Sequence, residues 1–393
     1  MVGAGLSRRS GRGKPFSAAA TRNAAKAPPN ALVCRYRGES EASVLVRNLG
    51  LCFIISGSIG VVLVSAEALV AQPALIAQTK EPLIALCVCT RGRPVMAARC
   101  FRSLRDQVGD PARMRLRVIV VDNCAAQTAR PVFDSIFAGG GADYVCCPEP
   151  GIPFARNAAI EAALAAGADY IAFIDDDEVA PPGWVDALLS AMNEADADVV
   201  QGEVRKVPLG ADLEQAASTQ AYAPRRWEKV ETVATCNTLF KAWLAEGPAG
   251  LRFDEAMRYT GGSDRDYFHR ACKRSARVVK VTGAHVLEEV AEGRDGFKYE
   301  CMRAFAAGNN YTLRMRKNEH LLRGSQRIVT RVLDRGVIGA LKLVFAALLL
   351  LAFQTKRAAR QWKKSGAAIS FAAGCISPLL GIRAQPYAVL QGH

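Results

Sequence analysis

The stretch Tyr170-Ile-Ala-Phe-Ile-Asp-Asp-Asp-Glu178 decides the fold class, because a short apolar run ends in four consecutive acids. The apolar residues do not alternate with polar ones, which is typical of a strand buried on both faces of a sheet. In α/β proteins, ligands bind where such strands end. A divalent cation with oxygen ligands, Mg²⁺ or Mn²⁺, would relieve the repulsion among the carboxylates. The alternative is a solvated acidic loop before a helix that follows Pro181-Pro182.

Further strands and helices alternate on both sides of this stretch, which predicts an α/β fold with a doubly wound, mostly parallel sheet and flanking helices. Pro94 suits the first turn of a helix. That helix has an apolar stripe ending at Val108. The predicted strands cover residues 83–89, 117–121, 144–147, 170–175 and 198–202, and the predicted helices cover 94–108, a segment ending near 166, and 184–194.

Length and composition limit the function classes. The chain has 393 residues, half of them hydrophobic, with a net charge of +14, so it holds one large α/β domain with appendages or two domains. The basic residues concentrate in 8–47 and 303–364 beside apolar segments, which favours an anionic membrane surface over nucleic acid. Twelve cysteines without any CxxC pair indicate buried free thiols in a reducing compartment.

Residues 1–80 are predicted to be a basic N-terminal extension. Residues 1–47 are rich in Arg, Ala, Gly and Ser and show no period, which predicts disorder, a start site too far upstream or a targeting peptide. Residues 49–66 are uncharged and close to the shortest length for a membrane-spanning helix. The arginines before this segment would send the rest of the chain outward, which conflicts with a cytoplasmic substrate.

Residues 321–393 form a basic and apolar C-terminal region. Its apolar segments, 337–353 and 367–382, are short for spanning helices, and Pro378 interrupts the second. A basic stretch, 356–364, separates them. We therefore expect interfacial or re-entrant helices at the membrane surface. The alternative is a pair of core helices that pack on the main domain.

Three acidic positions fall where a doubly wound sheet places ligands. Asp122 ends one strand, Asp175 to Asp177 end another, and Asp264 follows a Gly-Gly turn. A nucleoside diphosphate sugar could use all three, for the nucleoside, for a metal on the leaving diphosphate, and for a general base. Arginines near the first two, Arg91, Arg93 and Arg156, could balance the phosphate charge.

Five segments in this order resemble family 2 glycosyltransferases, most closely the succinoglycan glucosyltransferase branch of bacterial exopolysaccharide enzymes. They are Cys87-Val-Cys-Thr-Arg-Gly-Arg-Pro94, Val120-Val-Asp-Asn123, Gly151-Ile-Pro-Phe-Ala-Arg-Asn157, Phe173-Ile-Asp-Asp-Asp-Glu178 and Gly261-Gly-Ser-Asp-Arg-Asp266. The resemblance covers roughly residues 81–315. It implies a GT-A domain over 81–320, a nucleotide-sugar donor, a divalent metal and inversion at the anomeric carbon.

The resemblance also implies roles for single residues. Asp264 matches the catalytic base, although Ser263 replaces the Glu that usually precedes it. Asp177 matches a metal ligand, and Glu288 aligns near the position of a metal-binding His, with His285 the weaker candidate. The donor-binding positions are Thr90, Arg93, Asp122, Arg156, Asn157 and Asp175, and the candidate acceptor residues are Trp227 and Asp266.

The resemblance implies transfer of a hexose, with UDP-glucose the favoured donor, to a lipid-linked or growing saccharide at the cytoplasmic face of a bacterial inner membrane. Three alternatives compete. A haloacid dehalogenase-type phosphatase would place its acids on the first strand, and a nucleotidyltransferase would need a Gly-rich, Lys-containing loop. The third is a membrane-tethered binding protein with a degenerate site, which the loss of an acid at Ser263 would suggest.

Overall fold

The computed structural model describes residues 81–108, 115–222, 226–290 and 296–386, together with the backbone of four strands between residues 33 and 65. The chain divides into two compact units, Met1–Lys80 and Glu81–His393. The C-terminal region predicted from residue 321 onward falls in the second unit.

The four strands of the first unit pair as an antiparallel sheet in chain order. They are β1 (Val33–Arg37), β2 (Glu41–Arg47), β3 (Leu51–Ile55) and β4 (Val61–Ser65). The helix predicted over residues 49–66 is therefore wrong, as is disorder for the residues in β1 and β2. The apolar segment is rich in Ile and Val, which favour strands, and a short apolar run does not by itself distinguish helix from strand. The other residues of the predicted extension lie outside the described part of the chain.

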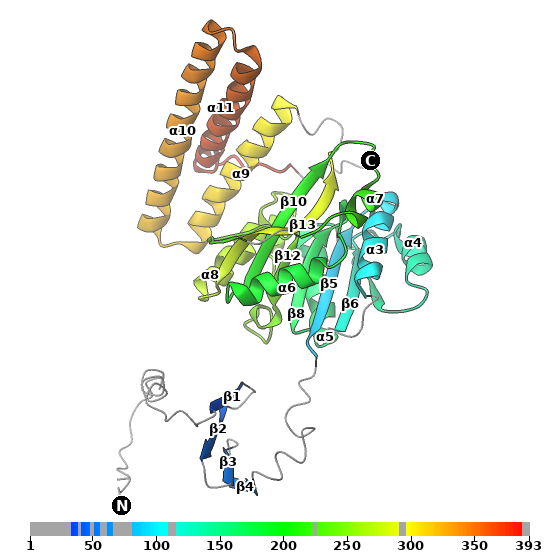
Figure 1. The fold of residues 1–393 in the computed structure, drawn as a ribbon. Coiled ribbons are helices and arrows are strands. Elements are labelled where there is room, and N and C mark those ends of the chain that lie inside the picture. The colour runs from blue at the N-terminus through cyan, green and yellow to red at the C-terminus, as the bar shows by residue number, and fades with distance from the viewer. Residues whose placement is uncertain are drawn as a thin grey trace, which may run out of the picture. The chain divides into compact units, whose positions relative to one another are not determined.

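The second unit is built on a mixed, mostly parallel nine-stranded sheet (Figure 1). One half is parallel, in the order β8-β5-β6-β7, as the alternation of strands and helices predicts. These strands are β5 (Leu83–Thr90), β6 (Arg115–Asp122), β7 (Ala142–Cys146) and β8 (Tyr170–Asp175).

The other half of the sheet contains antiparallel pairs that sequence alternation does not predict. The antiparallel strand β12 lies between β8 and β10, and β10 pairs in parallel with β13. The short strands β9 and β11 both pair with β13. The strands are β9 (Glu178–Val179), β10 (Val199–Val207), β11 (Trp227–Lys229), β12 (Thr238–Lys241) and β13 (Val278–Glu289).

Two apolar cores cover the two faces of the sheet, which explains why β5 has no polar alternation. Ile84, Leu86 and Val88 face one core, and Ala85 and Cys87 face the other. Helices α3 (Pro94–Val108), α4 (Arg130–Ile136) and α6 (Trp184–Glu194) contribute to the first core, and α5 (Ile152–Ala165) and α8 (Ser263–Lys273) to the second. A short helix, α7 (Leu213–Ser218), packs near β9 and β13.

Three long helices form a layer beside the sheet: α9 (Phe297–Asn318), α10 (Leu321–Leu351) and α11 (Thr355–Ile376) (Figure 1). The two apolar segments predicted as short helices fall within α10, α11 and the 3-10 turn Ser377–Leu380 that contains Pro378. Small residues bring α9 and α11 close together, and Gly308 lies against the carbonyl oxygen of Phe371. Among the described residues, no helix combines the length and apolar character needed to cross a membrane.

Candidate active site

The acids after β8 do not form a solvated loop. Asp176 is buried, and its Oδ2 accepts a hydrogen bond of 2.7 Å from the hydroxyl of Thr90 at the end of β5. The Arg93 guanidinium lies 3.6 Å from the other Asp176 oxygen and 3.9 Å from Asp177. Thr90 and Arg93, both predicted donor residues, therefore also hold the acidic turn in place.

Asp175 is the last residue of β8, and its side chain is 46% exposed. Burial raises its pKa to about 7, with Arg156 opposing the shift and the charges of Asp177, Asp176 and Asp264 adding to it. The guanidinium of Arg156 lies 3.9 Å from Asp175 and stacks over the ring of Phe253, 5.6 Å from its centroid. The structure thus brings together two predicted donor residues, Asp175 and Arg156.

Glu178 lies in β9 and is fully buried. Its carboxylate accepts a hydrogen bond of 3.0 Å from the backbone N–H of Asp175. Burial raises its pKa well above the ordinary value, and the neighbouring charge of Asp175 adds to the shift. Glu178 also lies opposite Glu288 in the β9–β13 pair, so Glu288 belongs to the acidic cluster.

The acidic cluster fits a divalent cation. Ligand atoms of Asp175, Glu178 and Cys236 lie within 4.8 Å of one another. Carboxylate oxygens suit Mg²⁺ and Mn²⁺, whereas a thiol does not, so the acids are the ligands to expect. Asp177 belongs to the same turn and is the predicted metal ligand.

Glu288 and His285 lie on one strand but face opposite sides, because side chains alternate along β13. The Glu288 carboxylate forms an ion pair with Lys206. His285 is fully buried, and its Nε2 lies 3.2 Å from the Gln220 side chain. Of the two candidates for the downstream metal position, the structure brings only Glu288 to the acids.

Asp122 offers an unused oxygen at the end of β6. Its Oδ2 accepts hydrogen bonds from the backbone of Ala129, at 2.9 Å, and the hydroxyl of Tyr144, at 2.8 Å. Its Oδ1 is buried and has no hydrogen-bond partner among the described residues. A buried acceptor without a partner is costly, so this oxygen fits an N–H or O–H group of a nucleoside. The neighbouring Asn123 fixes the following loop by accepting from the backbone of Gly151.

Asp264 lies in the first turn of α8, after Gly261 and Gly262 at φ of 72° and 76°. This left-handed conformation suits glycine and explains the Gly-Gly pair. The Oδ1 of Asp264 accepts a hydrogen bond of 2.8 Å from the backbone of Arg265. Its charge contributes to the raised pKa of Asp175, so the predicted base lies within electrostatic range of the donor acids although they are almost ninety residues apart in sequence.

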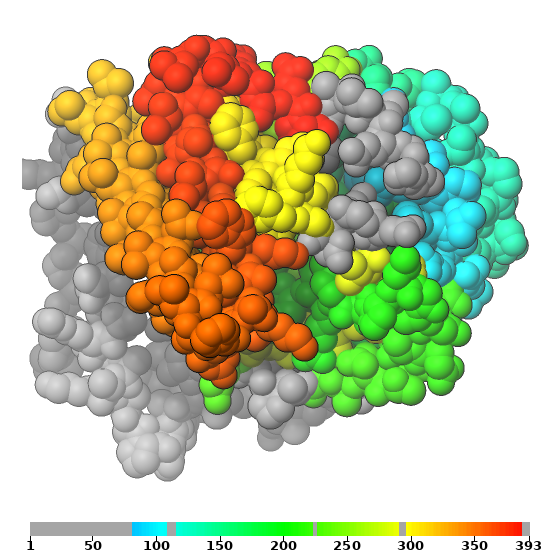
Figure 2. Space-filling model, turned by 90° about the horizontal axis from the view of Figure 1, so that it is seen from above, coloured from blue at the N-terminus to red at the C-terminus, as the bar shows by residue number. Residues whose placement is uncertain are grey.

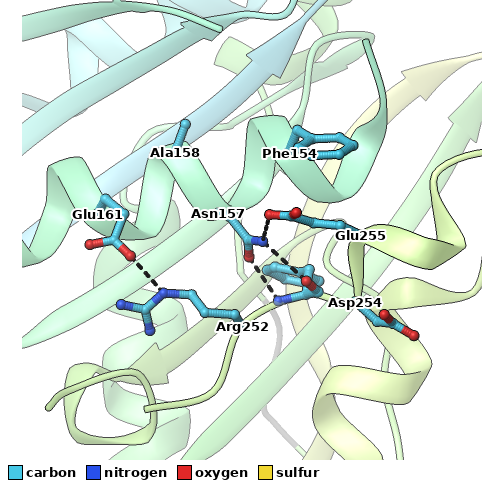
Figure 3. A pocket seen from close by; sticks show the side chains of 8 residues that line it. Phe154, Asn157, Ala158, Glu161, Arg252, Asp254 and Glu255 are labelled. Atoms are coloured by element: carbon cyan, nitrogen blue, oxygen red, sulfur yellow. Dashed lines mark hydrogen bonds and ion pairs between the residues drawn. The ribbon is translucent and has the colours of Figure 1, made fainter. Parts of the chain in front are cut away.

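Asn157 faces away from this site. Its amide nitrogen donates to the carbonyl of Phe253 at 3.0 Å, and its oxygen accepts from the Phe253 backbone at 2.7 Å. Figure 3 shows Asn157 in a shallow pocket beside Glu161 and Arg252, which form an ion pair with each other. Asn157 therefore links α5 to the segment after β12. None of its described interactions is with the acids after β8.

The two predicted acceptor residues make no described contact with the acids after β8. Asp266 is fully buried, and its oxygens accept from Arg270 at 2.8 Å and from Asn318 at 2.6 Å. Trp227 is 45% exposed and lies on edge strand β11. Four strand spacings separate β11 from β8, or about 19 Å.

Sequence reasoning missed three residues: Cys236 beside the acids after β8, and Asn310 and Arg314 on α9. Cys236 lies just before β12, and the pairing of β12 with β8 brings it to the acidic cluster. The sequence of β12 has no recognisable strand pattern. Asn310 donates from α9 to the carbonyl of Thr260, at 2.8 Å, just before the α8 turn. The signal available for α9 was the extent of the resemblance, which covers residues 81–315 and so includes both positions.

Residues 85–244 match the model of glycosyl transferase family 2. The succinoglycan biosynthesis protein ExoM of Rhizobium meliloti (strain 1021) is 31% identical over 302 residues, which span 75% of this chain and 92% of ExoM.

Solved structures of TarS from S. aureus are also similar. TarS is 14% identical with a TM-score of 0.41, over 72% of this chain and 54% of that chain. TarS 1–349 in complex with UDP-GlcNAc is 14% identical with a TM-score of 0.39, over 79% of this chain and 95% of that chain. The identity to ExoM over most of both chains decides the family, and it confirms the resemblance seen in the five motifs. The chain belongs to glycosyltransferase family 2 and is a nucleotide-sugar glycosyltransferase with a GT-A fold.

Proposed function

We propose that this enzyme transfers a hexose from a nucleoside diphosphate sugar, UDP-glucose first among the candidates, to a hydroxyl of a lipid-linked or growing saccharide, with inversion. The observation that carries the proposal is the position of Asp264, which lies in the first turn of α8 within electrostatic range of Asp175. One carboxylate thus lies apart from the acids that suit a metal, as a general base requires. The name of ExoM, a succinoglycan biosynthesis protein, supports an exopolysaccharide as the product.

The proposed reaction is a single displacement. Asp264 accepts the proton of the acceptor hydroxyl while that oxygen bonds to the anomeric carbon and the bond from this carbon to the diphosphate breaks. Arg156 lies beside Asp175, where it can bind the diphosphate, and the free Oδ1 of Asp122 can accept from the nucleoside. A Mg²⁺ or Mn²⁺ ion held by Asp175 and Asp177 would supply positive charge to the leaving diphosphate.

We further propose that the enzyme works at the cytoplasmic face of the inner membrane, bound through α10. Apolar side chains lie exposed along one stripe of this helix at intervals of three or four residues, and a basic segment follows in α11. This combination favours an anionic lipid surface. The stripe consists of Leu333, Val337, Leu341, Val344, Leu348 and Leu351.

The test of the reaction measures nucleotide release from a panel of UDP- and GDP-sugars with Mn²⁺, with and without a lipid-linked saccharide extract. The Asp264→Asn variant should lose about 100-fold or more in transfer, because a positioned base contributes on that order, while donor affinity stays within about threefold. The control is Asp134→Asn, since Asp134 is exposed on α4 and pairs with Arg130.

Each outcome of this test discriminates. Transfer by the Asp264→Asn variant at the wild-type rate would remove Asp264 from the role of base. Saturable UDP binding without turnover of any donor would instead favour the degenerate binding protein.

A further inference from the structure

Helix α9 presents three polar side chains to α8, each one turn after the last. Asn310 donates to the carbonyl of Thr260, and Asn318 donates to Asp266 at 2.6 Å. Residues four apart share one face of a helix. Arg314 lies midway between these two anchors, so it also faces the first turn of α8, which carries Asp264.

Arg314 is a buried cation without an ion pair among the described residues. Its side chain stacks over the Tyr311 ring, 5.5 Å from the centroid, and only 7% of the residue is exposed. Its Nε has no hydrogen-bond partner in the described part of the chain. A buried charge without a partner is costly, whereas a bound anion would remove much of that cost.

The charged groups around Arg314 are already engaged with other residues. Asp266 binds Arg270 and Asn318, and His269 lies 3.0 Å from Glu319. Asp264 and the exposed Arg265 also lie within electrostatic range of the guanidinium. Burial, with Arg265 second, lowers the pKa of Arg314, although an arginine remains protonated at physiological pH. Asp266 and Asp264 act on this cation from a distance, but no carboxylate in the described part of the chain forms an ion pair with it.

A second unused group lies one turn away. The Oδ1 of Asn310 is buried and has no hydrogen-bond partner among the described residues. This oxygen accepts hydrogen bonds, and the guanidinium donates them. A ligand with a hydroxyl beside a phosphate or carboxylate would satisfy both, which describes a charged saccharide.

The position relative to Asp264 assigns this ligand to the acceptor. Arg314 faces the first turn of α8, which carries Asp264, and the charge of Asp264 acts on Arg314 as well as on Asp175. Asp264 therefore lies within electrostatic range of both the donor acids and Arg314. An in-line displacement brings the acceptor hydroxyl to Asp264 at the face of the donor sugar opposite the diphosphate, so a group beside Asp264 is placed to hold the rest of the acceptor.

We propose that Arg314, together with Asn310, binds an anionic group of the acceptor, a phosphate or a carboxylate, next to the base Asp264. This inference rests on the function proposed above. A phosphate would come from a lipid-linked diphosphate saccharide, and a carboxylate would come from an acidic sugar. Arginine suits both anions because its planar fork donates two parallel hydrogen bonds.

The test uses the full-length protein loaded with Mn²⁺ and saturated with UDP, so that the donor site is occupied. Inorganic phosphate and glucuronate are titrated separately by calorimetry, and the tighter anion identifies the source of the charge. We expect Arg314→Met to weaken binding of that anion at least tenfold with UDP affinity unchanged. The matched control is Arg331→Met, because Arg331 lies over the same Tyr311 ring, also at 5.5 Å, but comes from α10.

A second variant, Arg314→Gln, keeps a polar side chain of similar reach in case the methionine variant fails to fold, and it should show the same loss. Equal anion affinity in wild type and a folded Arg314 variant would overturn the proposal, as would absence of binding of either anion to the wild type. UDP binding is read separately. Loss of that signal in the wild type would contradict the proposed function instead.

Discussion

At the scale of single residues, the acids after β8 differ because their surroundings differ. Asp176 accepts a hydrogen bond from Thr90, and Asp175 lies beside the guanidinium of Arg156. Glu178 is buried against β13. Burial raises the pKa of all three carboxyls, to about 6 for Asp176 and about 7 for Asp175. Without a cation, this cluster opposes ionisation, which links metal binding to the stability of the fold.

Glu178→Gln should stabilise the metal-free protein at about pH 8. The folded-state pKa of Glu178 lies above its ordinary value of 4.5, so the folded state holds a proton that the unfolded state releases. Stability from this group is therefore present below about pH 4.5 and is lost as pH rises. Glutamine does not ionise and can still accept from the backbone of Asp175. We expect a gain in the free energy of unfolding at pH 8, measured by denaturant unfolding, that disappears near pH 4.5.

The control for Glu178→Gln is Glu228→Gln, because Glu228 is exposed on β11 and should give a small difference that does not change with pH. Added Mn²⁺ should stabilise the wild type more than Glu178→Gln. An equal effect of pH on the stability of wild type and Glu178→Gln would contradict the assignment of Glu178 to the buried cluster.

At the scale of elements, the sequence predicts the strands and turns that depend on a local pattern of residues. Strands β5, β6 and β8 follow from apolar runs, and the Gly-Gly pair before Asp264 follows from the turn it makes. The antiparallel insertion of β12 depends on long-range pairing, so no local signal reveals it. The position of Arg314 is likewise not predictable from the sequence, where it is one of several basic residues in a basic helix. Only the packing of α9 on α8 distinguishes it.

Gly308→Ala should destabilise the helical layer. A Cβ at Gly308 would lie 2.1 Å from the carbonyl oxygen of Phe371 in α11, so α9 and α11 would have to separate. Overpacking of this kind costs about 1–3 kcal/mol, which thermal or denaturant unfolding would detect. The control is Gly336→Ala in α10, where an added Cβ meets nothing within 4 Å and helix propensity predicts a gain of up to about 1 kcal/mol. Equal stability changes for the two variants would show that the α9–α11 contact does not limit stability.

At the scale of the molecule, the helical layer connects the proposed membrane contact to the proposed base, Asp264. Figure 2 shows α9, α10 and α11 side by side, with α10 at the outside. α9 reaches the active site through Asn310 and also contacts α11, which in turn packs on α10. One continuous helical structure thus holds the apolar stripe of α10 and the polar groups near Asp264. An acceptor anchored in the bilayer would approach the base from the side of this layer.

The apolar stripe should decide whether the protein binds lipid. Leu341 and Leu348 are 64% and 57% exposed on it, and replacing both by Glu adds negative charge where apolar contact and anionic lipid are expected. We expect the double variant to lose at least tenfold in cosedimentation with phosphatidylglycerol vesicles, while release of nucleotide from the donor stays unchanged. Raised salt should weaken binding of the wild type, because the basic segment of α11 contributes by electrostatics. Leu209→Glu is the control, since Leu209 is 57% exposed in the loop after β10. If the double variant sediments like the wild type, α10 is not the surface that meets the membrane.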